Sequence, residues 1–155
     1  MKGNDKVVEL LNHMLADELT AVSQYMVHSS MCENWGYGKL HQAIEKRAVD
    51  EMKHAEKLIE RILFLEGAPV VNSLNKMLIG PKVEVQLKYD HEAEVDAIKA
   101  YNAGIHLATE ADDYGSAELL KSILKDEEIH LDWLEAQLDQ IDQMGIKNYL
   151  VEKVA

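Results

Sequence analysis

The stretch "DEMKH" at residues 50–54, with its counterpart "DEEIH" at residues 126–130, decides the fold of this chain. Each stretch has an Asp followed by a Glu, and a His three residues after that Glu. One Glu-x-x-His pair is a weak signal, because a solvent-facing pair on a charged helix is its ordinary interpretation. The spacing between the two stretches carries more information than either stretch alone.

An internal repeat relates the two halves of the chain. One spacing of 76 positions joins four pairs of residues: Glu51 with Glu127, His54 with His130, Glu18 with Glu94, and Tyr25 with Tyr101. The surroundings match as well, since "ELTAVSQY" (18–25) and "EVDAIKAY" (94–101) share Glu, Ala, Tyr and two apolar positions. The pattern indicates two related helical hairpins, although a duplicated fold with purely structural matches is the alternative.

Apolar residues recur with a 3.6-residue period in four long segments, at about 5–33, 38–65, 82–111 and 116–143. The C-terminal "IKNYLVEKV" is a weaker candidate for a fifth helix. Gly67 and Pro69 predict the end of the second helix, and Ser116 is the predicted N-cap of the fourth.

The lengths of the connections predict how these helices are arranged. Two joints are short, so the first two helices are expected to be antiparallel neighbours, as are the last two. The segment 66–81 is long enough to travel the length of a bundle. We therefore expect an all-α four-helix bundle, formed as a single domain by residues 1–155. Its first two helices run up and down, a crossover follows, and the last two helices run down and up.

Four carboxylates fall in an unexpected place, on the apolar faces of these helices and near the middle of each. They are Glu18, Glu51, Glu94 and Glu127, and His54 and His130 accompany two of them. Burying uncompensated carboxylates together costs several kcal/mol per ion, so the pattern predicts a cationic partner. Two divalent ions would cancel the four negative charges, as in carboxylate-bridged di-metal sites of helical bundles.

The types of side chain narrow the choice of metal and suggest supporting residues. Mixed oxygen and nitrogen ligands favour iron or manganese over a thiolate zinc site, and the imidazoles disfavour magnesium. Asp50 and Asp126, each one turn before a His, are candidates to accept the second N–H of that His, or they are simply solvated acids. Tyr25 and Tyr101 are interpreted as bundle packing with a hydroxyl near the metals, and a redox role for Tyr25 is the less favoured alternative.

Composition limits the other possibilities. The chain has 155 residues, 47% of them hydrophobic and 28% charged, with a formal net charge of −12. This acidity argues against nucleic acid or an anionic membrane as a partner. The single Cys32 excludes an internal disulfide and a CxxC metal motif, and it is expected in the core. No signal-peptide or membrane-spanning stretch is recognised, so a cytoplasmic location is expected.

The chain resembles the bacterioferritins, the haem-containing branch of the ferritin superfamily. The resemblance covers essentially its whole length, through "MKG", "NWG", "DEMKHAEKLIERILFLEG", "DEEIHLDWLE" and "MGIKNYL". It implies a ferritin-like four-helix bundle with a long crossover between helices two and three and a short C-terminal fifth helix. It also implies iron storage and ferroxidase activity, with dioxygen or peroxide oxidising Fe(II) to Fe(III) for storage in a shell of 24 subunits.

The resemblance assigns particular residues to the iron and the haem. The two-iron ligands are Glu18, Glu51, His54, Glu94, Glu127 and His130, with Glu51 and Glu127 bridging. Haem b is shared by two subunits across a two-fold axis, and its axial ligand from each matches Met52, whose repeat counterpart is Glu128. A small ferredoxin for iron release is a further implied partner.

One departure from the family pattern concerns the inner wall of the 24-subunit shell that the resemblance implies. Some relatives use a His near position 46 together with Asp50 for an additional iron site, but here Lys46 and Arg47 stand in that stretch. That auxiliary site is therefore in doubt.

Two other classes of function remain open from the sequence. A different di-iron or di-manganese peroxidase or catalase could use the same bundle, although one Cys excludes a rubrerythrin-type electron-transfer module. A non-enzymatic haem-binding or structural bundle is the other alternative, and it predicts no oxygen consumption with ferrous ion.

Overall fold

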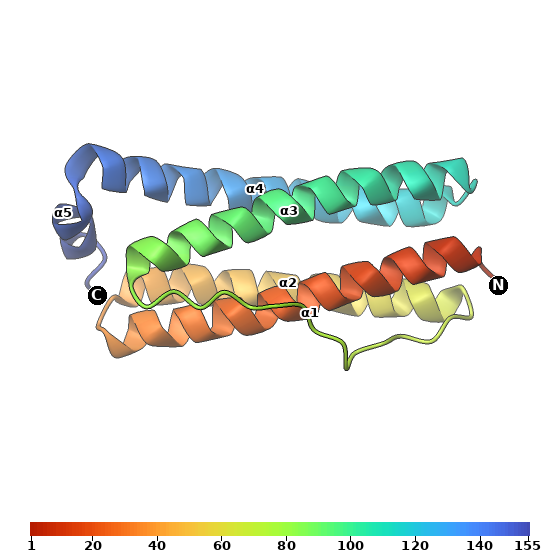
Figure 1. Ribbon diagram of the computed structural model, residues 1–155, viewed down its shortest axis with the longest axis horizontal. Coiled ribbons are helices and arrows are strands. Elements are labelled where there is room, and N and C mark those ends of the chain that lie inside the picture. The colour runs from red at the N-terminus through yellow and green to blue at the C-terminus, as the bar shows by residue number, and fades with distance from the viewer.

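A computed structural model describes residues 1–155 of the chain, and its regular structure is entirely helical (Figure 1). The elements are α1 (Asp5–Asn34), α2 (Gly38–Phe64), α3 (Val83–Glu110), α4 (Tyr114–Met144) and α5 (Ile146–Val151). The four predicted long helices are confirmed to within two residues at each end. The C-terminal tail forms the predicted short fifth helix. None of the helices is long and apolar enough to cross a membrane.

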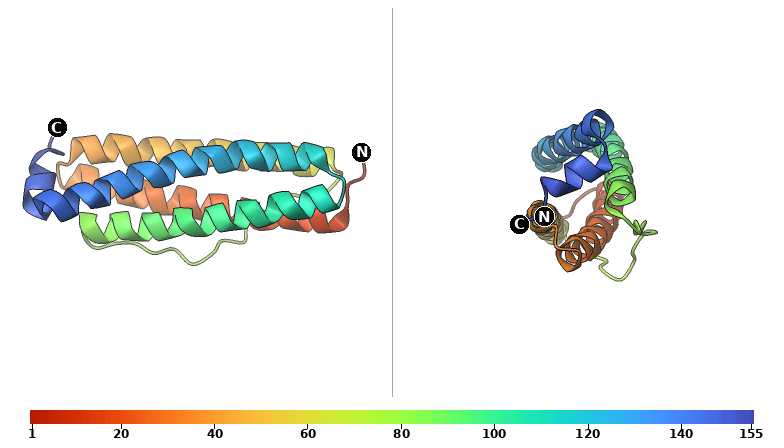
Figure 2. Two further views of the ribbon diagram at one scale, coloured as in Figure 1. Left: turned by 90° about the horizontal axis from the view of Figure 1, so that it is seen from above. Right: turned by 90° about the vertical axis from the view of Figure 1, so that its left-hand side faces the viewer.

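The four long helices lie side by side along one axis (Figures 1 and 2). α1 packs chiefly against α2, and α3 packs chiefly against α4, as the short joints predict. The segment between α2 and α3 runs back along the bundle, so α3 points in the same direction as α2 (Figure 1). This is the predicted ferritin-like four-helix arrangement with one long crossover between helices two and three.

The two hairpin turns repeat each other in detail. α1 ends before Gly36, which has φ of 85°, and α3 ends before Asp112, which has φ of 56°. Both are left-handed residues placed 76 positions apart, and each is followed by a residue whose N–H reaches back to the helix: Tyr37 to Cys32, and Asp113 to Ala108, both at 2.9 Å. Left-handed residues of this kind close the last turn of a helix. The sequence repeat therefore extends to the backbone of the turns.

The start of α4 differs from the prediction of Ser116 as its N-cap. Asp113 is the N-cap, and its carboxylate accepts from the backbone N–H of Ser116 at 3.0 Å and from its hydroxyl at 2.7 Å. Arg61 of α2 also donates to Asp113, at 2.7 Å. The acidic side chain is the stronger acceptor for the free N–H groups of the first turn, so the helix begins two residues earlier than expected.

The end of α2 depends on close packing at Gly67. The left-handed residue is Glu66, with φ of 61°, while the N–H of Gly67 reaches Ile62 at 2.9 Å. A Cβ at Gly67 would lie 2.6 Å from Cγ1 of Val8 on α1. Glycine at 67 therefore permits a close approach of the chain to α1, and the helix stops there as predicted.

The crossover is fixed to one face of α1 by hydrogen bonds from its backbone. The acceptors are Asn12 for Val70 (2.8 Å), Thr20 for Asn75 (2.8 Å), Gln24 for Leu78 (3.1 Å) and His28 for Gly80 (3.0 Å). The last three acceptors are four residues apart, so they lie along one stripe of the helix. This stripe holds the crossover in place over α1.

The core consists of two apolar clusters. One surrounds Leu11, Leu58 and Leu120, towards the N-terminus of α1, and the other surrounds Leu40, Leu87 and Tyr149, towards α5. Cys32 belongs to the second cluster and is fully buried, as expected. In each long helix, the buried Glu lies between the residues of one cluster and those of the other. The polar site is thus enclosed by apolar packing at both ends.

Candidate metal centre

The fold brings together all six residues that the sequence predicts as ligands. Glu18 comes from α1, Glu51 and His54 from α2, Glu94 from α3, and Glu127 and His130 from α4. Each is between 1% and 3% exposed. Because Glu and His at i and i+3 share a helix face, each Glu-x-x-His pair points both side chains to the bundle axis.

These side chains form two overlapping groups, and the ligand-type atoms of each group lie within 4.8 Å of one another. We name the group Glu18, Glu51, His54 and Glu127 the His54 position. The group Glu51, Glu94, Glu127 and His130 is the His130 position. Glu51 and Glu127 belong to both, which is the geometry expected of carboxylates that bridge two ions.

Contacts within each position are close. His54 Nδ1 is 2.9 Å from Glu127 Oε1 and 3.7 Å from Glu18 Oε2. His130 Nδ1 is 2.8 Å from Glu51 Oε1 and 3.6 Å from Glu94 Oε1. Each imidazole therefore faces the shared carboxylate of the opposite hairpin.

Several buried polar atoms of the centre have no hydrogen-bond partner. They are Glu18 Oε2, Glu51 Oε1, Glu94 Oε2, Glu127 Oε1 and His130 Nδ1. Buried polar atoms are nearly always paired in proteins, and an unpaired one costs about 1–3 kcal/mol. Five such atoms pointing into one small space fit a donor set for cations, and their mixed oxygen and nitrogen chemistry suits iron or manganese.

The pKa values of these groups reflect the crowding of charge. Burial raises the pKa of Glu51, and the neighbouring Glu18 raises it further. Burial and the hydrogen bond with Glu127 likewise raise the pKa of Glu94. Burial lowers the pKa of His130, but its carboxylate neighbours outweigh burial and bring it to about 12. Without bound cations, protons held by these groups therefore offset the negative charge of the carboxylates.

The two aspartates support the histidines in a crossed arrangement, contrary to the expected pairing of each Asp with the His of its own helix. Nε2 of His54 is 2.9 Å from Asp126, and Nε2 of His130 is 3.2 Å from Asp50. The reason is geometric: Nε2 is the far end of the ring, so it reaches the neighbouring helix rather than the root of its own. Because a carboxylate accepts, Nε2 donates to the aspartate, and Nδ1 is the nitrogen that would offer its lone pair to a cation once its own proton is displaced.

The two tyrosines are crossed in the same way. The hydroxyl of Tyr25 donates to Glu94 Oε1 at 2.5 Å, and the hydroxyl of Tyr101 donates to Glu18. Burial and the nearby carboxylates raise the pKa of both phenols well above the usual value, so both remain neutral donors. Each hairpin thus orients the single Glu of the other, and the predicted placement of these hydroxyls near the centre is confirmed.

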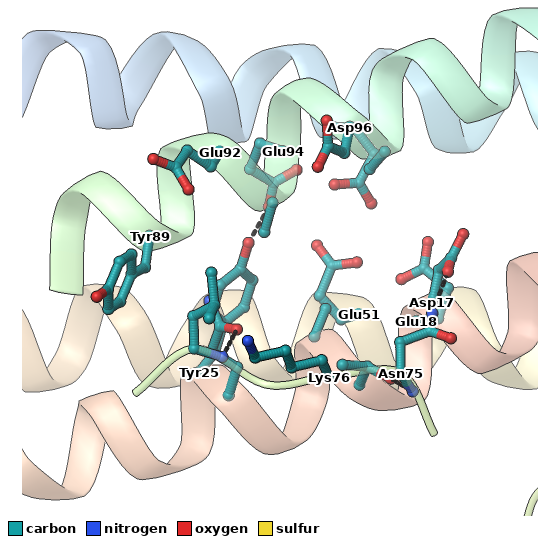
Figure 3. Close-up of a pocket in the computed structure, with 17 residues that line it drawn as sticks. Asp17, Glu18, Tyr25, Glu51, Asn75, Lys76, Tyr89, Glu92, Glu94 and Asp96 are labelled. Atoms are coloured by element: carbon teal, nitrogen blue, oxygen red, sulfur yellow. Dashed lines mark hydrogen bonds between the residues drawn. The ribbon is translucent and has the colours of Figure 1, made fainter. Parts of the chain in front are cut away.

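A pocket of about 230 Å³ leads from the surface to the centre, between α1 and α3 and beneath the crossover (Figure 3). Glu18, Glu51, Glu94 and Glu127 form part of its wall. Its remaining polar lining includes residues that sequence reasoning missed: Asp17, Asn75, Lys76, Glu92 and Asp96. Asn75 and Lys76 come from the crossover, whose sequence carries no periodic signal, so only the folded chain places them here.

Met52 lies outside the centre. Its side chain is 45% exposed, and it shares an outward face of α2 with the exposed Val49. Lys46 is exposed as well, whereas Arg47 is half-buried and stacks over Trp133, with its Cζ 5.5 Å from the ring centroid. Positions 46 and 47 therefore carry a lysine and an arginine and no histidine.

A four-helix bundle with one crossover and an internal Glu and Glu-x-x-His ligand set defines the class of ferritin-like, carboxylate-rich metal proteins. The family model for the ferritin-like domain matches residues 8–144. A bacterioferritin of Mycobacterium tuberculosis is 39% identical, covering 100% of this chain and 98% of that protein. A bacterioferritin of Rhodobacter capsulatus is also 39% identical (100% and 96%), and one of Brucella melitensis is 40% identical (96% and 92%). The chain belongs to the bacterioferritin family.

Proposed function

We propose that this chain is the subunit of an iron-storage protein and that it oxidises ferrous ions at the six-residue centre. The observation that carries the proposal is the pair of overlapping four-residue groups sharing Glu51 and Glu127, buried in the middle of the bundle. Membership of the bacterioferritin family supports iron as the metal.

Each residue has a defined role in this proposal. Glu18 and His54 hold one ferrous ion, Glu94 and His130 hold the other, and Glu51 and Glu127 bridge both. Asp126 and Asp50 keep the imidazoles turned inward by accepting their Nε2 protons. Tyr101 and Tyr25 hold Glu18 and Glu94 in place. Four carboxylates then balance two divalent ions, which removes the cost of burying them.

The reaction transfers one electron from each of two ferrous ions. Dioxygen accepts two electrons and two protons to give hydrogen peroxide, or peroxide accepts two electrons and two protons to give two waters. Two ferric ions are the other product. The centre favours this oxidation because four nearby carboxylates stabilise the higher charge of Fe(III).

The pocket between α1 and α3 supports an access route for the substrates. Its acidic residues Asp17, Glu92 and Asp96 outnumber the single Lys76, so the lining favours cations, and the pocket ends at the carboxylates of the centre. We assign storage of the ferric product to a shell of 24 copies of the chain, as in the family that the sequence resembles. The chain mass of 17.5 kDa predicts an assembly of roughly 420 kDa.

We also propose that Met52 ligates haem b shared with a second copy across a two-fold axis. Met52 and Val49 offer an exposed thioether beside an exposed apolar side chain on one face of α2. A soft thioether is a known axial ligand of haem iron. The iron centre and the haem would then lie on different faces of α2, because Met52 is about 100° around the helix from Glu51.

The deciding experiment is an anaerobic ferrous titration of the metal-free protein, with size measured by light scattering on the same sample. We expect two ferrous ions per subunit to bind, and their oxidation to follow on adding dioxygen or peroxide. A particle near 420 kDa that retains ferric iron supports storage. Peroxide or dioxygen turnover by a lone bundle that retains no iron would instead indicate a peroxidase or catalase. Binding of haem without oxidation would indicate a non-enzymatic bundle.

A further inference from the structure

The internal repeat gives the two metal positions the same ligands, but their surroundings differ, and one of the differing residues is charged. Arg47 lies beside the His130 position. Its repeat counterpart, 76 residues later, is Ile123, which is fully buried in the apolar core beside the His54 position. One position therefore has a cationic neighbour and the other an apolar one.

Arg47 is close to the aspartate that supports His130. Its Nη1 is 3.9 Å from Asp50 Oδ2, and the same Oδ2 lies 3.2 Å from His130 Nε2. The Arg47 side chain is only 15% exposed, and it is stacked on Trp133 of α4. A charge at such a place is poorly screened by solvent.

Arg47 also borders the carboxylate that belongs to the His130 position alone. A small space of about 10 Å³ is lined by Arg47 together with Glu94, Tyr25, Asp90 and Trp133, among others. Nε of Arg47 is buried and has no hydrogen-bond partner, and neither does Oε2 of Glu94. Arg47 thus lies 3.9 Å from the Asp50 carboxylate that supports His130 and lines the same small space as Glu94.

The other position has no such cation. Asp126, which supports His54, is 48% exposed and forms no ion pair with a lysine or arginine. Its carboxylate therefore keeps its full negative charge for the imidazole of His54. The asymmetry between the positions is electrostatic, while their ligand sets remain equivalent.

We propose that Arg47 makes the two positions unequal in affinity, so that a divalent cation fills the His54 position first and the His130 position second. This inference rests on the proposed metal centre. Two effects of the guanidinium act in the same direction. It repels a cation at the His130 position, and by pairing with Asp50 it weakens the carboxylate that makes His130 a good donor.

An orienting role for Arg47 would act in the opposite direction, since loss of a support normally weakens metal binding. The contact between Arg47 and Asp50 is 3.9 Å, which is too long for a hydrogen bond. Asp50 contacts His130 directly, at 3.2 Å, and not through Arg47. The charge of Arg47 therefore outweighs its support, and Arg47 is a positioning residue that acts through electrostatics.

The test is a double-mutant cycle on the assembled protein, with anaerobic Co²⁺ binding followed by visible absorbance. His54→Ala leaves the His130 position, and His130→Ala leaves the His54 position. In the His54→Ala background, we expect Arg47→Met to raise Co²⁺ affinity by about tenfold. In the His130→Ala background, the same change should alter affinity less than twofold. Arg47→Lys, which keeps the charge, should restore the original affinity.

Arg47→Gln serves as a second neutral variant, so that a folding defect specific to methionine cannot mimic the result. Equal effects in the two backgrounds, a loss of affinity on neutralisation, or failure of lysine to restore the original value would each overturn the inference. The proposed function fails separately, if the unmodified protein does not bind two Co²⁺ per subunit. Two bound ions without any selective effect of Arg47 would remove only this inference.

Discussion

At the scale of single residues, the centre depends on acidic groups placed where a protein core would normally exclude them. Glu18, Glu51, Glu94 and Glu127 are at most 3% exposed, and several of their oxygens have no protein partner. Burial of this kind stabilises nothing in the absence of cations. The proposed metal binding would account for these residues, whereas packing accounts for their neighbours along each helix.

Substitution of Glu94 by alanine tests the role of a single carboxylate. We expect Glu94→Ala to lower the initial rate of ferrous oxidation at least about 100-fold, because a ligand contributes more than the 10–100-fold typical of its supporting partners. Far-UV circular dichroism should show an intact bundle, since the two apolar clusters stay in place and only the hydrogen bond from Tyr25 is lost. Glu110→Ala, an exposed change on the same helix, should leave the rate unchanged. A normal rate in Glu94→Ala would disprove the assignment.

The raised pKa values predict that protons and metal ions compete. In the folded metal-free protein, Glu51 and Glu94 hold protons above their usual pKa of 4.5, and His130 holds one up to about pH 12. Their contribution to stability is therefore full below pH 4.5 and decreases as the pH rises through the folded pKa values. Divalent ions replace these protons, so Co²⁺ affinity should increase with pH.

Proton release in an unbuffered titration measures this competition directly. We expect Co²⁺ to displace protons from the unmodified protein near pH 7, and fewer from His130→Ala. Binding without acidification of the solution would contradict the charge states described for the centre.

At the scale of the elements, the two hairpins are organised around each other. His54 is supported by Asp126 and His130 by Asp50, while Tyr101 holds Glu18 and Tyr25 holds Glu94. Neither hairpin can therefore orient its own ligands alone. The turns that join the helices of each hairpin are also equivalent, since Gly36 and Asp112 both have left-handed backbone conformations.

Gly67 offers a test of how the end of α2 is packed. Gly67→Ala should lower the denaturant midpoint by an amount equivalent to about 1–3 kcal/mol, because its Cβ would lie 2.6 Å from Val8 Cγ1. Val8→Ala removes that methyl group, so the double variant should recover part of the loss relative to Val8→Ala alone. Gly36→Ala is the matched comparison, since its cost is backbone strain at φ 85° with open space around it. Purely additive losses at Gly67 and Val8 would exclude the clash.

At the scale of the whole molecule, the bundle encloses a polar layer between two apolar clusters. Its outer surface includes an exposed thioether. The clusters around Leu58 and Leu40 keep the helices in register, which holds the ligands within reach of each other. The pocket beneath the crossover opens the centre between α1 and α3. Met52 lies on a separate, exposed face of α2.

Replacement of Met52 tests the proposed haem ligand separately from the proposed oxidation of iron. Met52→Leu should abolish the bis-methionine haem spectrum of the purified protein, because leucine offers no lone pair to iron. The rate of ferrous oxidation should stay within about twofold of the original, since position 52 is directed away from the centre. Persistence of that haem spectrum in the variant would rule out Met52 as the ligand.

Much of the fold could be predicted because its signals are periodic and local. The 3.6-residue apolar pattern located four helices, and the length of 66–81 predicted the crossover. The prediction of Ser116 as the N-cap of α4 was wrong. Asp113 is the cap, and its choice depends on Arg61 from another helix. The pocket residues Asn75 and Lys76 could not be predicted, since they lie in a segment without periodicity.

The amino-acid sequence by itself determined which six side chains meet, because the 76-residue repeat and the helical period place them on facing stripes at one level of the bundle. Only the tertiary structure decided how they are supported. Distances between different helices decide which Asp orients which His and which Tyr holds which Glu. They also decide which position has Arg47 beside it. Helical periodicity fixes directions within one element, whereas contacts between elements follow from packing that no single segment encodes.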